Sequence, residues 1–66
     1  MPVISIEMHN TDTETKKALI KNLTKTAVDV TNIPAEKFTV FINELDSANI
    51  GIGGLSLAEI KAAQAR

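Results

Sequence analysis

The 66-residue sequence contains no cysteine and a single histidine. Disulfide bonds are therefore excluded, and a zinc site has no plausible set of ligands. These are two common supports of small folds, and a chain of this length buries only about 60% of the surface that its unfolded form exposes. We therefore expect no metal, and we expect the chain to gain stability by association with further copies.

Aromatic residues and net charge are also scarce: the aromatics are Phe38 and Phe41, and the net charge is −1 at pH 7. Nucleic-acid binding is disfavoured, because it needs a basic surface and, for single strands, aromatic stacking platforms. No apolar run approaches the roughly 18 residues of a membrane span, and residues 1–8 lack the features of a signal peptide. The hydrophobic share of 44% is close to that of a globular domain. We expect one cytoplasmic domain over residues 1–66, without nucleic-acid or membrane partners.

The first half of the chain has the hydrophobic pattern of a strand followed by a long helix. Residues 2–8 alternate with a period of two, as a half-buried strand does. Thr11 and Glu14 have the spacing of a capping box, which predicts a helix start near residue 13. Apolar residues then recur every three or four positions to about residue 31, which predicts one buried helix face. The members of this face are Leu19, Ile20, Leu23, Ala27 and Val30.

The second half predicts another strand, a tight turn and a short helix. Residues 32–34 end the long helix, since asparagine accepts left-handed geometry and the residue before proline avoids the helical region. Residues 38–44 are β-branched and aromatic on both faces, as in a strand covered on both sides. Three glycines in residues 51–54 suit a tight hairpin or the close approach of another chain. The capping-box spacing that begins at Ser56 predicts a helix over 57–65.

The predicted fold class is α/β. A strand, a helix and a second strand form a βαβ unit, so the two strands should run parallel with a right-handed crossover. A C-terminal hairpin and a short helix complete the protomer. Two strands and one helix cannot cover their own faces and edges, so the protomer should assemble into an oligomer.

Four segments carry a resemblance to a known family. They are Met1-Pro2 opening into an apolar strand, residues 16–23, residues 40–44 and residues 49–54. In this order and spacing they resemble the 4-oxalocrotonate tautomerase family of the tautomerase superfamily, over residues 2–54. The resemblance implies a homohexamer, a trimer of dimers with helices outside and sheets toward the centre. It also implies a tautomerase that needs no cofactor.

Pro2 is the catalytic residue that the resemblance implies. Removal of the initiator methionine leaves Pro2 with a free secondary amine, and an apolar pocket lowers the pKa of such an amine toward neutrality. The free base can take a proton from carbon beside a carbonyl and return it elsewhere, which is a keto–enol tautomerisation of small 2-hydroxy-dienoate or enol–keto acids. We therefore expect the native chain to begin at Pro2. The alternative is that Pro2 starts a strand and has no further role.

The residues that would hold the substrate depart from the family pattern. Related enzymes carry one arginine in the turn after the first strand and another in the second strand, where both bind substrate carboxylates. The corresponding positions here are Asn10-Thr11 and Thr39, and Ile50 replaces an aromatic residue before the glycines. Threonine cannot imitate the permanently charged guanidinium, so we expect a preference for monoacids or less charged enols.

Two further residues are candidate substrate contacts. Lys37 lies two positions before Thr39 and is expected to point to the same face of the strand; the alternative is a solvated lysine in a turn. His9 lies beside the turn as a proton donor or polar contact; the alternative is an exposed histidine without a role.

The missing arginines leave a second class of function open. This alternative is a non-catalytic oligomeric module that keeps the fold and binds a small molecule or a partner. Proline-based hydration or dehalogenation of unsaturated acids is a further option among enzymes. The fold by itself does not choose between these functions.

Overall fold

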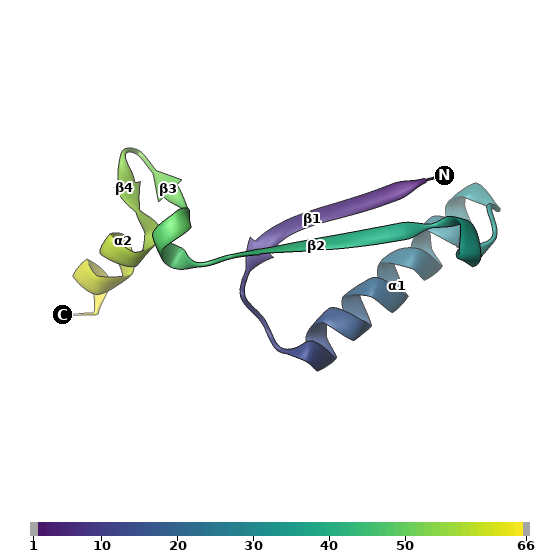
Figure 1. The fold of residues 1–66 in the computed structure, drawn as a ribbon, viewed down its shortest axis with the longest axis horizontal. Coiled ribbons are helices and arrows are strands. Elements are labelled where there is room, and N and C mark those ends of the chain that lie inside the picture. The colour runs from purple at the N-terminus through teal and green to yellow at the C-terminus, as the bar shows by residue number, and fades with distance from the viewer. Residues whose placement is uncertain (1, 66) are drawn as a thin grey trace.

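In the computed structural model, which describes residues 2–65, a long helix lies along one face of a pair of strands (Figure 1). A small hairpin and a second helix extend beyond the far end of these strands, and the chain measures 49 × 24 × 15 Å. The elements in chain order are β1 (Val3–His9), α1 (Thr13–Thr31), the 3-10 helix η1 (Ala35–Lys37), β2 (Thr39–Leu45), the 3-10 helix η2 (Ser47–Asn49), β3 (Gly51–Ile52), β4 (Leu55–Ser56) and α2 (Leu57–Gln64).

Strands β1 and β2 pair in parallel, as the βαβ prediction required. Their register runs from Val3 opposite Thr39 to His9 opposite Leu45. Along β1, half-buried and exposed residues alternate strictly, so one face is partly covered and the other is open. The partly covered face carries Ile4, Ile6 and Met8 from β1 with Val40 and Ile42 from β2.

The ends of α1 show one confirmed and one wrong prediction. The helix ends at Asn32, whose φ of 62° is left-handed, and the Asn32 amide donates to the Val28 carbonyl at 2.8 Å. At the other end the cap is Asp12, whose carboxylate accepts from the Thr15 amide at 2.7 Å. The predicted capping box starting at Thr11 is therefore wrong. The physical reason is that a charged oxygen stands one residue closer to the helix.

The residues predicted for the covered face of α1 are correct in the middle of the helix and wrong at two positions. Leu19, Leu23 and Ala27 are half-buried, whereas Ile20 is 43% exposed and Val30 is 76% exposed. Two strands about 5 Å apart make a sheet no wider than the helix itself, so the sheet shields only the centre of the apolar face.

The hairpin and the short helix have the predicted turn chemistry. Strands β3 and β4 pair in antiparallel fashion, and the turn between them uses positive φ angles at Gly53 (62°) and Gly54 (88°). The Ser56 hydroxyl accepts from the Glu59 amide at 3.1 Å, and the Glu59 carboxylate accepts from the Ser56 amide at 2.8 Å. This reciprocal capping box starts α2, as predicted.

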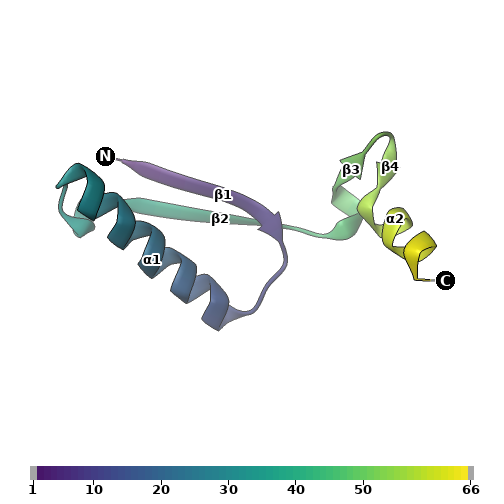
Figure 2. The same ribbon diagram turned by 180° about the vertical axis from the view of Figure 1, so that it is seen from behind.

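The protomer has no closed core. Among residues 2–65 no side chain is fully buried, and several large apolar side chains are more than half exposed: Val3, Val30, Phe41, Ile52 and Leu55. A chain without buried side chains gains too little from burial to offset its conformational entropy. Figure 2, seen from behind, shows α1 against one face of the strand pair only. No helix within residues 2–65 is long and apolar enough to cross a membrane.

Candidate active site

Pro2 and Thr39 lie together at the amino end of the strand pair. The Thr39 amide donates to the Pro2 carbonyl at 3.1 Å, which extends the parallel ladder by one residue. Both residues are half-buried. The parallel register follows from the βαβ crossover, because both strands then start at the same edge of the sheet. Two of the sequence-predicted site residues are thus neighbours.

Lys37 lies outside strand β2, so the strand alternation from which its placement was predicted does not apply to it. Lys37 ends the 3-10 helix η1, is exposed, and donates its amide to the Pro34 carbonyl at 3.0 Å. The alternation of side chains that motivated the expectation holds only within a strand, and β2 starts at Thr39. The structure supports the alternative, an exposed lysine in a turn.

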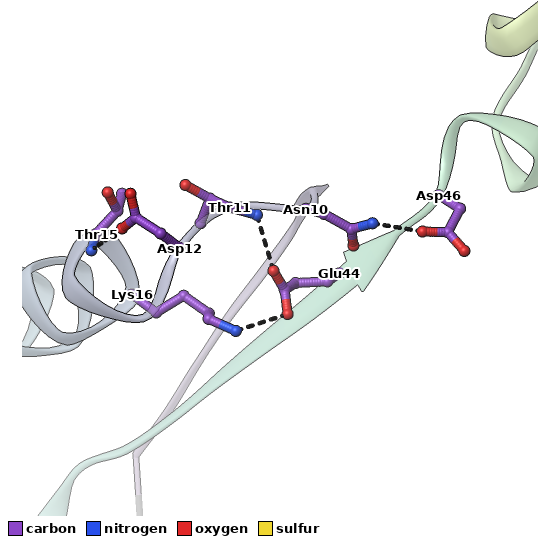
Figure 3. Close-up of polar contacts among 7 residues, drawn as sticks. All are labelled: Asn10, Thr11, Asp12, Thr15, Lys16, Glu44 and Asp46. Atoms are coloured by element: carbon purple, nitrogen blue, oxygen red, sulfur yellow. Dashed lines mark hydrogen bonds and ion pairs between the residues drawn. The ribbon is translucent and has the colours of Figure 1, made fainter.

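The Asn10-Thr11 turn lies at the opposite, carboxyl end of the strand pair, where it is fixed by two carboxylates (Figure 3). The Thr11 amide donates to Glu44 Oε2 at 2.9 Å, and the Asn10 side-chain amide donates to Asp46 Oδ1. Lys16 Nζ, in the first turn of α1, donates to Glu44 Oε1 at 2.8 Å. Glu44 therefore joins the turn, the helix start and the end of β2.

These hydrogen bonds favour the charged forms of the carboxylates. The Lys16 ammonium, and after it the Thr11 amide, hold the pKa of Glu44 below the ordinary value of 4.5. Hydrogen bonds from Thr15 hold the pKa of Asp12 below 3.8. Both groups are therefore carboxylates at neutral pH.

His9 lies beside the turn, as expected, and contacts the segment that follows β2. Its Nε2 atom lies 2.9 Å from the Ser47 hydroxyl oxygen, and the same oxygen accepts from Lys61 Nζ at 3.5 Å. His9 is exposed. Together with the Asn10–Asp46 hydrogen bond, this contact links the end of β1 to the start of the C-terminal segment.

Ile50 is half-buried between η2 and β3, and its carbonyl accepts from the Leu57 amide at 2.7 Å. It thus belongs to the C-terminal segment, like Ser47, and not to the edge that holds Pro2. The seven residues of β1 separate Pro2 from the Asn10-Thr11 turn, a distance of roughly 26 Å for eight steps of about 3.3 Å. One chain therefore brings the predicted site residues together in two groups, not in one pocket.

A surface hollow of about 480 Å³ runs along α1 and contains none of the predicted site residues. Its lining comes from Ile20, Lys21, Thr24, Lys25, Val28, Asp29 and Ala35. Within residues 2–65 no group of three or more histidine or carboxylate side chains is arranged to hold a metal ion.

The sequence reasoning missed Glu44, Lys16 and Asp46 as neighbours of the turn. A signal was available, because a parallel βαβ unit places the last residues of both strands at one edge. In the observed register Glu44 stands opposite Met8, two residues before Asn10. A polar residue at that end of β2 is therefore within reach of the turn.

Comparison with known proteins gives the same fold and family. The family model described as "Tautomerase enzyme" matches residues 2–60. A probable tautomerase of Bacillus cereus is 33% identical over 60 residues, which is 89% of this chain and 98% of the relative. Among solved structures, TomN, a 4-oxalocrotonate tautomerase homologue in the tomaymycin biosynthetic pathway, is 27% identical with a TM-score of 0.87, covering 92% of this chain and 95% of TomN.

A second solved structure is a heterohexameric 4-oxalocrotonate tautomerase from Chloroflexus aurantiacus. It is 28% identical with a TM-score of 0.82, over 91% of this chain and 98% of its own. Fold and sequence thus define a small α/β protein of the tautomerase type. This chain belongs to the tautomerase family, and its structural neighbours are homologues of 4-oxalocrotonate tautomerase.

Proposed function

We propose that this protein is a cofactor-independent tautomerase with Pro2 as its general acid–base. The observation that carries the proposal is the family match, which starts at Pro2 and extends to residue 60. The substrates would be small 2-hydroxy-dienoate or enol–keto acids. The position of Pro2, directly before an apolar strand and beside Thr39, supports this role.

The proposed chemistry depends on a free amine at Pro2. Once Met1 is removed, the Pro2 nitrogen is a secondary amine, and apolar surroundings lower its pKa because desolvation penalises the charged form. The free base takes a proton from the carbon next to a carbonyl and returns it at another position. Thr39, on the neighbouring strand, would supply a neutral polar contact to the substrate instead of a charged one.

We further propose that the site is completed between copies of the chain in a homo-oligomer, as a hexamer. The Asn10-Thr11 turn and Ile50 are separated from Pro2 of their own chain by the length of the strand pair. They can approach a Pro2 only on another copy. The exposed apolar side chains of the open sheet face and of the hairpin provide the surface for such association. A relative that assembles as a heterohexamer supports the number of six subunits.

The test is an enol–keto assay on protein whose intact mass corresponds to a chain starting at Pro2. Pro2→Ala should lower kcat by at least about tenfold, since a primary amine replaces the rigid secondary one. Sedimentation should show the same assembly for both proteins. Unchanged turnover in Pro2→Ala protein would refute Pro2 as the base. Assembled Pro2-initiated protein without turnover would favour the alternative, a non-catalytic binding module, which the absent arginines also suggest.

A further inference from the structure

The cation closest in the hydrogen-bond network to the Asn10-Thr11 turn is already engaged by a carboxylate. Lys16 Nζ lies 2.8 Å from Glu44 Oε1, and the other oxygen of the same carboxylate accepts the Thr11 amide at 2.9 Å. Figure 3 shows both contacts converging on Glu44. Glu44 therefore holds the Lys16 ammonium in place and offsets its positive charge.

We propose that Glu44 sets the charge selectivity of the turn, by retaining the Lys16 ammonium and adding a negative charge of its own. This proposal rests on the proposed function and names its substrate class more closely. The favoured substrates carry a single carboxylate, and the end of the substrate that meets the turn is uncharged.

The Lys16–Glu44 pair is closer and less exposed than the other ion pair that involves α1. Its side chains are 31% and 26% exposed, and their charged atoms are 2.8 Å apart. The other ion pair recorded within residues 2–65, Lys25–Asp29, has side chains that are 73% and 65% exposed and a separation of 3.6 Å. Water competes less for the ammonium of the less exposed pair, so Lys16 is held more firmly than Lys25.

The other charges at the turn do not restore a positive field. Asp12 caps α1 and Asp46 accepts the Asn10 side chain, so both carboxylates also stand at this end of the strand pair. Lys16 balances Glu44 and leaves these two negative charges unbalanced. Lys61 is the next cation in the network, and it reaches Ser47 at 3.5 Å, beyond Asp46. A second substrate carboxylate at the turn would therefore be repelled.

The substitution Glu44→Gln tests the charge of this side chain separately from its hydrogen bond to the turn. Glutamine keeps a side-chain oxygen for the Thr11 amide but removes the negative charge and releases Lys16. We expect the ratio of kcat/KM for a 2-hydroxy-dienedioate to that for the matching 2-hydroxy-dienoate to rise about threefold or more, the usual size for one exposed charge. The rise should shrink at high salt, because exposed charges are screened.

Two variants serve as controls in the same assembled protein. Glu44→Gln combined with Lys16→Met should lose the gain in dienedioate selectivity, because no ammonium remains to be released. Asp29→Asn, in the exposed ion pair on the same helix, should leave the ratio unchanged. A purely structural role of Glu44 would instead change both substrates equally and would not depend on salt.

A binding measurement keeps this inference separate from the proposed catalysis. Calorimetric titration with hexanoate and with hexanedioate compares one and two carboxylates without any turnover. If Glu44→Gln raises the relative affinity for hexanedioate but no variant has turnover, the tautomerase proposal fails and the role of Glu44 stands. An unchanged affinity ratio, equal changes for both probes, or binding of neither probe overturns the role of Glu44.

Discussion

The two ends of the β1–β2 pair differ in how they are held and in the chemistry they can perform. At the amino end, the Thr39 amide of β2 donates a backbone hydrogen bond to the Pro2 carbonyl. At the carboxyl end, Glu44 and Asp46 fix the turn through hydrogen bonds to charged groups. In the proposed mechanism the first end holds the amine that takes up the proton, whereas the second end is a charged frame.

Under the proposed function, this contrast gives a physical reason for completing the site between copies of the chain. A low pKa for an amine needs apolar surroundings, whereas a charged frame needs water or ionic partners. Within one chain the two ends lie the length of a strand apart. Association of copies would bring the two kinds of end together.

The open sheet face should hold the assembly together. Phe41→Lys places a charge on this face, and burying an unpaired charge costs several kcal/mol, so association should weaken by about 10³-fold or more. Val30→Lys is the matched control, because Val30 is an exposed apolar residue on α1 and not on the sheet. Sedimentation equilibrium should show an oligomer for Val30→Lys and dissociated, largely unfolded chains for Phe41→Lys. The reverse result would place the interface on the helix.

Blocking the Pro2 amine should abolish turnover without changing the structure at the carboxyl end of the strand pair. In a chain with an uncleaved N-terminal extension, the Pro2 nitrogen is a tertiary amide without useful basicity. Turnover should fall by about 10²-fold or more, the usual contribution of a general base. Proteolytic release of Pro2 should restore it, whereas hydrogen exchange at Thr11 should be the same before and after. Full activity with the extension in place would contradict the proposed mechanism.

Placing a guanidinium beside Pro2 should change which acids are preferred. Thr39→Arg adds a charged, bidentate donor to the amino end, so kcat/KM for a dienedioate should rise about tenfold relative to the dienoate, within the range of one charged hydrogen bond. Thr39→Gln is the control with a long but neutral side chain. If the unmodified protein already prefers the dienedioate, the account of the missing arginines is wrong.

The same contrast explains what the sequence could and could not predict. The predicted bounds agree with the structure within about one residue for β1, β2 and α1, because apolar periodicity is local information. The cap at Asp12 and the 3-10 turn at Lys37 were missed because short polar segments admit several local hydrogen-bond patterns. The Lys16–Glu44 contact joins residues 28 positions apart, so it depends on the strand register.

Acid should loosen the carboxyl end before the amino end. Glu44 and Asp12 have folded-state pKa values below their ordinary values of 4.5 and 3.8, so the unfolded chain binds protons more readily than the folded one. Their stabilising effect is complete above the ordinary values and is lost as the pH falls through the lower, folded values. The melting temperature should therefore hold between neutral pH and about pH 5 and then decline.

Amide hydrogen exchange can show which end of the strand pair loses stability in acid. We expect this effect to be smaller than those of Phe41→Lys, of the N-terminal extension and of Thr39→Arg. The Thr11 amide, bonded to Glu44, should lose protection on acidification before the Thr39 amide, bonded to the Pro2 carbonyl, because only the first acceptor can be protonated in this range. Glu44→Gln should make Thr11 protection insensitive to acid, and Asp29→Asn should behave like the unmodified protein. Simultaneous loss of protection at Thr11 and Thr39 would mean that the two ends of the strand pair open together. This result would contradict the prediction that they respond to acid separately.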